Sequence, residues 1–145
     1  MPPSNLAILD TSVYIENFRT GRFEDRLTRS PWLVRVSAVV LHELRRGART
    51  LIERRFVEDL RRNTRVITPT EGDWVRSAEI VAQLRRRRGY DANKLRGLAF
   101  DVLIALCARS IGAVVITCDR TDFAELKRYL AVTVLDWSEG AGVRL

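Results

Sequence analysis

Short apolar runs alternate along the chain with longer segments in which apolar residues recur every three or four positions. The short runs predict five strands, at residues 5–9, 33–36, 66–67, 114–116 and 132–135. The longer segments predict a helix that starts near Val13 and further helices over 21–30, 38–46, 50–62, 71–88, 95–111 and 123–129. The turn-rich tail from Asp136 shows no comparable pattern.

Strands that alternate with helices pair in parallel, because a right-handed helical crossover returns each strand to the same direction. The pattern therefore predicts an α/β fold, a three-layer α/β/α sandwich with a mainly parallel central sheet. A length of 145 residues suits one domain that spans residues 1–145. Ligand sites in such sheets lie beyond the carboxyl ends of the strands, which is where Asp10 and Asp119 fall.

Five carboxylates fall where this fold would gather them at one edge of the sheet. They are Asp10 after the first strand, Glu43 in the helix after the second, Asp101 in the long apolar helix, and Asp119 and Asp122 after the fourth strand. Two carboxylates about 5 Å apart repel by roughly 3 kcal/mol at an effective dielectric of about 20, so a cluster of four would not stay ionised without cations. Hard oxygen ligands suit Mg²⁺ or Mn²⁺, and a pair of such ions can activate water toward a phosphodiester. The sequence thus predicts a metal-dependent nuclease, in which the hydroxyls of Thr11, Ser12 and Thr117 orient the carboxylates or hold water.

Each acid also has a structural role that the sequence leaves open. Asp101 shares a helix face with apolar residues, so an arginine, a cap or a metal must offset the several kcal/mol that an unpaired buried carboxylate costs. Asp10 can cap the helix that follows it, although the two hydroxyl residues after it can do so instead. Glu43 can be a solvated helix residue. Asp119 and Asp122 can form a turn or a cap, and we favour Asp119 in the site and Asp122 as a helix cap or auxiliary residue.

Basic residues outnumber acidic ones, and the net charge is +7 with 25 Lys and Arg against 18 Asp and Glu. A basic surface around an acidic pocket suits RNA or DNA, because the surface field steers phosphates toward the pocket. A GC-rich genome would explain the excess of arginine equally well. Arg45, Arg46 and Arg49 lie close to the candidate site in sequence and are the candidates for phosphate contacts. The four arginines at 85–88 fit either a solvated helix end or a contact to RNA or to an acidic partner.

Several other classes of chemistry lack their residues in this chain. His42 is the only histidine, which excludes a two-histidine ribonuclease mechanism. Zinc sites built from Cys and His lack ligands, and no phosphate-binding glycine loop occurs. Cys107 and Cys118 are expected to be reduced, buried thiols. No apolar run approaches the roughly 20 residues that span a bilayer, and the first residues lack a signal-peptide pattern, so we expect a cytoplasmic protein without a membrane segment.

Four segments taken together resemble the PIN-domain nucleases, and in particular the VapC-type toxins of bacterial toxin–antitoxin pairs. They are residues 9–13, 37–47, 100–105 and 115–123, and their order, their spacing and the chain length agree with that family. Each segment is weakly specific by itself, but the set covers nearly the whole chain. The resemblance implies the same three-layer α/β/α fold.

The resemblance further implies a Mg²⁺- or Mn²⁺-dependent endoribonuclease that cleaves structured RNA such as tRNA or rRNA. It gives Asp10, Glu43, Asp101 and Asp119 the metal-binding and catalytic role and leaves Asp122 as an auxiliary residue. It also implies a homodimer and a cognate VapB-like antitoxin whose C-terminal segment covers the site.

Two other functions stay open on the sequence alone. One is a PIN-like nuclease that acts in RNA processing or on DNA without an antitoxin. The other is a receiver domain or a non-enzymatic acidic binding module. A receiver needs an aspartate after the third strand and a lysine after the fifth, whereas Thr68 and Pro69 follow the third and no lysine follows residues 132–135. A phosphatase with Asp-x-Asp after the first strand is disfavoured because Ser12 takes the place of the second aspartate.

Overall fold

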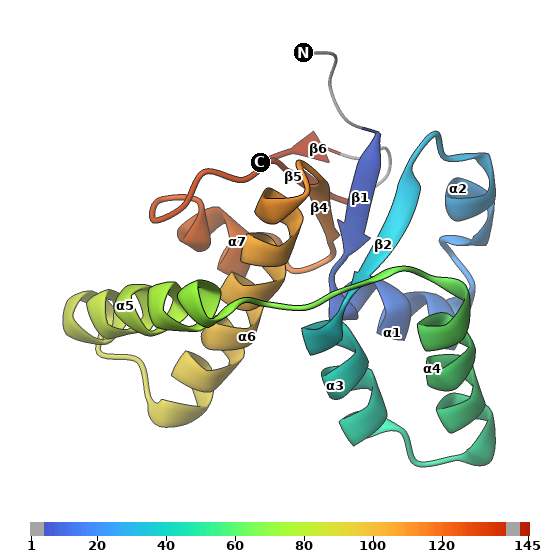
Figure 1. The fold of residues 1–145 in the computed structure, drawn as a ribbon, viewed down its shortest axis with the longest axis horizontal. Coiled ribbons are helices and arrows are strands. Elements are labelled where there is room, and N and C mark those ends of the chain that lie inside the picture. Colours follow the sequence, from blue (N-terminus) through green and yellow to red (C-terminus); the bar gives the residue numbers. More distant parts are fainter. Residues whose placement is uncertain (1–4, 139–142) are drawn as a thin grey trace.

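A six-stranded sheet in the order β3-β2-β1-β4-β5-β6 forms the middle of the fold, in a computed structural model that describes residues 5–138 and 143–145 (Figure 1). The strands are β1 (Leu6–Leu9), β2 (Leu33–Ser37), β3 (Val66–Ile67), β4 (Val114–Thr117), β5 (Val134–Asp136) and β6 (Val143–Arg144). Strands β1 to β5 run parallel, and β6 runs antiparallel to β5. The mainly parallel sheet that the sequence predicts is thereby confirmed.

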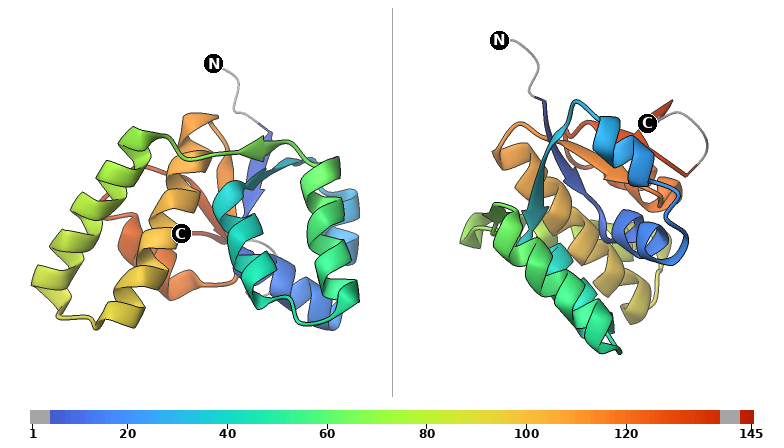
Figure 2. Two further views of the ribbon diagram at one scale, coloured as in Figure 1. Left: turned by 60° about the horizontal axis from the view of Figure 1, so that its bottom comes forward. Right: turned by 90° about the vertical axis from the view of Figure 1, so that its right-hand side faces the viewer.

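Helices connect these strands and cover both faces of the sheet. They are α1 (Thr11–Thr20), α2 (Glu24–Arg29), α3 (Ala38–Gly47), α4 (Leu51–Asn63), α5 (Glu71–Arg88), α6 (Ala92–Ser110) and α7 (Arg120–Leu126). Helix α6 packs against β1, β2 and β4, whereas α1 and α2 lie on the opposite side of the sheet (Figure 2, right). This is the predicted α/β/α arrangement. The pairs α3–α4 and α5–α6 stand apart and extend past the carboxyl ends of the strands (Figures 1 and 2).

The central strands and α6 supply most of the core. Ile8 of β1 and Ile116 of β4 are fully buried, and every residue of α6 from Val102 to Ala108 is buried. Between Val102 and Ala108, α6 is apolar around its circumference, and it packs against α5 as well as the sheet. Each fully buried Leu, Ile or Val contributes about 1.5–3 kcal/mol to folding, so this helix is held firmly where Asp101 emerges from it.

Side-chain caps set the starts of two helices that the apolar pattern places too late. The Asp91 carboxylate accepts a hydrogen bond from the backbone N of Lys94 at 2.9 Å, and α6 begins three residues earlier than predicted. The Asp119 carboxylate accepts one from the backbone N of Asp122 at 3.2 Å, and α7 both begins and ends three residues earlier than predicted. The first turns of these helices are polar, so they carry no apolar periodicity.

The C-terminal segment adds a strand that the apolar pattern does not predict. Strand β5 begins at Val134, two residues later than predicted, and β6 pairs with it so that Leu135 lies opposite Arg144. Strand β6 has only two residues, too few for an alternating pattern. The chain start and part of the turn-rich tail, residues 1–4 and 139–142, lie outside the described residues. Within the described ranges, no helix combines the length and the apolar character that crossing a bilayer requires.

Candidate metal-binding active site

The candidate site lies at the carboxyl ends of the two central strands. Strands β1 and β4 pair in parallel with Leu9 opposite Ile116, and the backbone N of Asp10 donates to the Ile116 carbonyl at 2.8 Å. Asp10 directly follows β1, and Asp119 comes just after β4. Both acids therefore leave adjacent strands at the same edge of the sheet, where parallel α/β folds hold their ligands.

Three carboxylates meet at this edge. Asp101 of α6, Asp119, and Asp122 of α7 each offer a carboxylate oxygen, and these atoms lie within 4.8 Å of one another. Burial raises the pKa of Asp101 well above its ordinary value, and the negative charges of Asp10, Asp122, Glu43 and Asp119 raise it further. No arginine or other side chain in the described ranges pairs with Asp101. Within the described ranges Asp101 therefore lacks the arginine partner that the sequence left open.

Asp10 is buried beneath two hydroxyl groups, with 3% of its surface exposed. Its Oδ2 accepts hydrogen bonds from Ser12 Oγ at 2.7 Å and from Thr117 Oγ1 at 3.0 Å. Burial raises the pKa of Asp10, and these hydrogen bonds partly offset the rise. The side chain makes no capping bond to α1, so Asp10 does not take the capping role that its position allows.

Glu43 reaches the site from α3 and is held by a hydroxyl of α1. Thr11 Oγ1 donates a hydrogen bond to Glu43 Oε1 at 2.9 Å. Burial raises the pKa of Glu43 and the charge of Asp10 adds to this rise, whereas the charge of Arg46 opposes it. Glu43 is therefore not the solvated helix residue that the sequence left open.

Asp119, rather than Asp122, caps helix α7. Asp119 precedes the helix, and its carboxylate accepts from the backbone N of Asp122. Of the two roles predicted for Asp122, helix cap or auxiliary residue, the cap is excluded, because Asp122 lies within the first turn, past the capping position. Its carboxylate turns instead toward Asp101. Thr117 supports this arrangement, since its Oγ1 accepts from the backbone N of Asp119 at 2.8 Å.

Lys94 is a residue of this cluster that the sequence analysis missed. Its Nζ lies 2.6 Å from Asp122 Oδ1, and the Asp122 side chain is only 15% exposed. Lys94 lies seven positions before Asp101 on α6, about two helical turns, so the two side chains share a helix face. That spacing, in a chain whose only lysines are Lys94 and Lys127, is the signal that would have found it.

The three candidate phosphate-binding arginines divide between two surfaces. Arg46 is close enough to Glu43 to lower its pKa, and its guanidinium lies 5.8 Å from the centre of the Phe100 ring. Arg49 and Glu43 both line a cavity of about 630 Å³ between α1, α3 and α4. Arg45 lines a separate cavity of about 380 Å³ along α4. Arg46 and Arg49 therefore lie near Glu43, whereas Arg45 lines a different cavity.

The basic run at the end of α5 contributes to packing within the chain. Arg88 Nε lies 2.8 Å from Glu125 Oε1 of α7, and the Arg87 guanidinium lies 5.6 Å from the centre of the Tyr129 ring. Cation–π and ion-pair contacts of this kind fasten α5 to the segment around α7. Two of the four arginines at 85–88 thus have partners in the fold.

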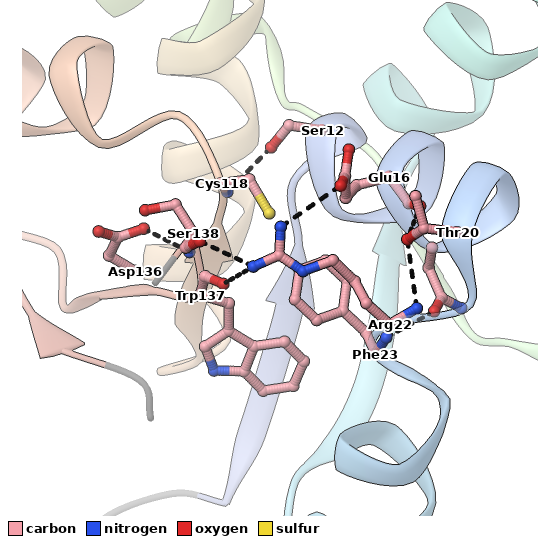
Figure 3. A network of polar contacts seen from close by, with 10 residues as sticks. Ser12, Glu16, Thr20, Arg22, Phe23, Cys118, Asp136, Trp137 and Ser138 are labelled. Atoms are coloured by element: carbon pink, nitrogen blue, oxygen red, sulfur yellow. Dashed lines mark hydrogen bonds and ion pairs between the residues drawn. The ribbon is translucent and has the colours of Figure 1, made fainter. Parts of the chain in front are cut away.

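A polar network beside the site joins the segment after β5 to α1 (Figure 3). The Arg22 guanidinium donates to the carbonyls of Trp137 and Ser138 at 3.3 and 2.7 Å and pairs with Glu16 at 3.3 Å. The backbone N of Cys118 donates to Ser12 Oγ at 3.0 Å, the same hydroxyl that binds Asp10. These contacts therefore link α1 to the segments that follow β4 and β5.

Both cysteines are free thiols. Burial raises the pKa of the Cys118 thiol to about 11, so it is protonated at neutral pH and is a poor metal ligand there. Carboxylates are thus the ligands that this edge of the sheet offers to a metal ion.

Comparison with known proteins identifies the family. The chain matches the model of the PIN domain over residues 7–129, so it belongs to the PIN domain family. Among solved structures, VapBC-1 from nontypeable Haemophilus influenzae has a TM-score of 0.68 at 21% identity, covering 92% of this chain and 99% of that chain. A DNA-bound VapBC from Salmonella typhimurium has a TM-score of 0.61 at 25% identity, covering 90% and 97%. No curated protein sequence matches the chain significantly.

A third similar structure is also a VapBC complex. VapBC-5 from Mycobacterium tuberculosis, a member of the VapBC family of toxin–antitoxin systems, has a TM-score of 0.59 at 25% identity and covers 91% of this chain and 98% of that chain. The resemblance to VapC-type PIN nucleases that the sequence motifs indicated is confirmed by the family match and by these structures.

Proposed function

We propose that this chain is the toxin of a VapBC-type pair and cleaves RNA as a Mg²⁺- or Mn²⁺-dependent endoribonuclease. The observation that carries the proposal is the Asp101 carboxylate, which has a raised pKa, lacks a partner in the described ranges and lies within 4.8 Å of oxygens of Asp119 and Asp122. Such a cluster stays ionised at neutral pH when a cation offsets its charge. The proposal takes residues 1–145 as one nuclease domain that acts in the cytoplasm.

The donor set fits a hard divalent cation. In this proposal Asp10, Glu43, Asp101 and Asp119 hold the metal and Asp122 is auxiliary, and carboxylate oxygens are the ligands that Mg²⁺ and Mn²⁺ prefer. When bound, such ions stabilise negative charge on a phosphoryl oxygen and lower the pKa of a bound water.

The hydroxyls around the acids orient them. Thr11 holds one oxygen of Glu43, while Ser12 and Thr117 both bind the same oxygen of Asp10. Neutral donors of this kind fix the direction of a carboxylate without neutralising its charge, so the acid keeps its affinity for a cation.

The basic surface supplies the attraction for RNA. The net charge of +7 favours a polyanion, and Arg46 and Arg49 lie beside Glu43, where they can bind phosphates that flank the cleaved bond. Arg45 would contact RNA only along α4. The VapC-type resemblance favours a structured RNA, tRNA or rRNA, as the substrate.

The cavity between α1, α3 and α4 is the proposed place for a VapB-like antitoxin. It has a volume of about 630 Å³, and Glu43 is one of its lining residues. Ile15 and Phe18 line it and are 41% and 47% exposed, and Arg19 and Arg49 lie on its walls. An apolar segment that carries acidic side chains would suit these walls. A homodimer is proposed on the family resemblance, and sedimentation of the purified chain would test it.

Cleavage of purified tRNA and rRNA tests the proposed activity directly. We expect Mg²⁺ or Mn²⁺ to support cleavage, EDTA to stop it, and Asp10→Asn and Asp101→Asn each to abolish it while the fold persists. Asp59→Asn, which removes an exposed acid of α4, is the matched control and should cleave normally. Cleavage that survives EDTA or Asp101→Asn would contradict the metal mechanism.

Expression in a bacterial host separates the toxin role from other nuclease roles. A toxin should arrest growth, and co-expression of the small protein encoded beside it should relieve the arrest. Cleavage of RNA or DNA without growth arrest would favour a PIN nuclease that works in RNA processing or on DNA without an antitoxin.

A further inference from the structure

A lysine ammonium contacts the acidic cluster of Asp101, Asp119 and Asp122 at Asp122. Lys94 Nζ is 2.6 Å from Asp122 Oδ1, and its side chain is 40% exposed, so it reaches the cluster from the solvent side. No other ion pair involves the five candidate acids within the described ranges. Among the described residues, Lys94 is therefore the positive side chain that forms an ion pair with the cluster, through Asp122.

The backbone that carries Lys94 is fixed, whereas its side chain is long and flexible. The backbone N of Lys94 donates to the cap residue Asp91 at 2.9 Å. Tyr90 Oη donates to Glu125 Oε2 at 2.8 Å, and Arg88 pairs with the other oxygen of the same carboxylate, so the loop before α6 is tied to α7. In this same position the ammonium also lies 5.8 Å from the centre of the Tyr90 ring.

We propose that Lys94 is a built-in counter-ion that competes with a divalent cation for Asp122. The inference rests on the proposed metal-dependent function and specifies how the same site is regulated. An ammonium and a divalent cation at close range on the Asp122 carboxylate repel each other, so each weakens the binding of the other. In the metal-free protein the ammonium offsets part of the charge of the cluster. A cation that takes Asp122 releases the ammonium toward solvent at the entrance of the site.

Competition of this kind makes occupancy of Asp122 depend on the divalent ion concentration. Ions bound through the other acids keep their ligands whether or not Lys94 is displaced. Asp122 then becomes a metal ligand only where the ion outcompetes the ammonium. This accounts for the two observations on Asp122, which lies within 4.8 Å of Asp101 and Asp119 and also forms an ion pair with Lys94.

Calorimetric titration of the full chain with Mn²⁺ at constant pH tests the inference. Lys94→Met should lower the Kd for Mn²⁺ roughly fivefold, the effect expected for release of a partly exposed ion pair. Lys94→Arg keeps the cation and should bind Mn²⁺ much as the unchanged chain does. Arg96→Met is the matched control, because it removes one positive charge from the exposed side of the same helix, where Arg96 bonds Asn93 rather than an acid.

Thermal unfolding supplies a second readout that does not depend on activity. In EDTA, Lys94→Met should lower the Tm because Asp122 loses its counter-ion next to Asp119 and Asp101. Saturating Mn²⁺ should then raise the Tm of this variant by more than it raises that of the unchanged chain, because tighter binding to the folded state gives more stabilisation.

The results that would overturn the inference are distinct from those that would overturn the function. Equal Kd values for Lys94→Met and Arg96→Met would show only a long-range effect of charge, and weaker binding by Lys94→Met would show that Lys94 assists the metal. Either result overturns the competition while the proposed nuclease stands. An unchanged chain that binds no Mn²⁺ would overturn both.

Discussion

The hydroxyl of Thr117 donates a hydrogen bond to Oδ2 of Asp10 at 3.0 Å, although the two residues are 107 positions apart in the sequence. The same hydroxyl accepts from the backbone N of Asp119 at 2.8 Å. One buried side chain thus fixes both the acid after β1 and the backbone of the acid after β4. This is possible because the parallel pairing of β1 with β4 sets the ends of the two strands side by side.

Thr117→Val tests this link, because valine keeps the shape of threonine and removes both hydrogen bonds. We expect the free energy of unfolding to fall by about 1–2 kcal/mol, since Asp10 Oδ2 loses one of its two hydroxyl donors and the Asp119 N–H loses its acceptor. RNA cleavage should fall roughly 10- to 100-fold, the usual effect of removing a group that orients a metal ligand. Urea denaturation and a cleavage assay measure the two effects. Thr117→Ser retains the hydroxyl and should keep most of the stability and most of the RNA cleavage. Normal cleavage by the Thr117→Val variant would show that the two hydrogen bonds are dispensable.

Thr11→Val should affect catalysis more than stability. Thr11 Oγ1 is a hydrogen-bond donor to Glu43, which is half-buried, and water can replace the lost hydroxyl. We expect a stability loss of about 1 kcal/mol or less. Cleavage should drop about tenfold because Glu43 is no longer held toward the other acids. Thr20→Val on the exposed end of the same helix is the control, and equal cleavage by the two variants would contradict the role of Thr11.

The metal-free protein should become less stable as the pH rises. Burial raises the pKa of Asp10, Glu43, Asp101 and Asp119 above their ordinary values. An acid with a raised folded-state pKa binds more protons when folded. Its contribution to stability is complete below the unfolded-state pKa, near 4, and is lost as the pH rises through the folded-state pKa.

Urea unfolding in EDTA between pH 4 and pH 8 measures this dependence. The free energy of unfolding should decline over that range, and Mg²⁺ should remove much of the decline because a bound cation offsets the charges. Asp101→Asn should flatten the curve and stabilise the metal-free protein at neutral pH, whereas Asp59→Asn should leave the curve unchanged. A decline of equal size in the Asp101→Asn variant would argue against repulsion at this site.

Arg22→Met should loosen the segment that follows β5. The variant loses the bonds to the Trp137 and Ser138 carbonyls and the ion pair with Glu16 (Figure 3). We expect a stability loss of about 1–2 kcal/mol, since hydrogen bonds from a charged donor are stronger than neutral ones. Amide hydrogen exchange should speed up in β5 and at Ser138. Arg19→Met removes a nearby exposed arginine of α1 and should change neither quantity.

The sequence predicted the elements well where a regular pattern marks them, and it predicted the position of the acids that directly follow a strand. The strands around Ile8 and Ile116 form where apolar runs predict them, because buried parallel strands need continuous apolar side chains. Asp10 and Asp119 follow those strands, so the parallel topology alone was enough to bring them to one edge. The sequence did not predict strand β6, because two residues are too few to show a period. It placed the starts of α6 and α7 too late, because their first turns are polar and show no apolar period.

The arrangement of side chains within the site was beyond the reach of any pattern. The residue that caps α7 is either Asp119 or Asp122, depending on where the helix begins. The two possible starts differ by about one helical turn. The separation of Arg45 from Arg46 and Arg49 depends on how α3 is rotated against the sheet and on where α4 lies. These are properties of packing, which residue spacing within one helix does not encode.

By itself, the amino-acid sequence determined the layers, the parallel sheet and the acids that stand at its carboxyl edge, because burial imposes a periodicity that can be read along one chain. Only the tertiary structure decided that Asp101 has no protein partner in the described ranges, that Thr117 serves two acids, and that Lys94 lies against Asp122. The physical reason is that charge pairing depends on distance in space. Distances of a few ångströms between α6, α7 and the strand ends exist only after the core has packed.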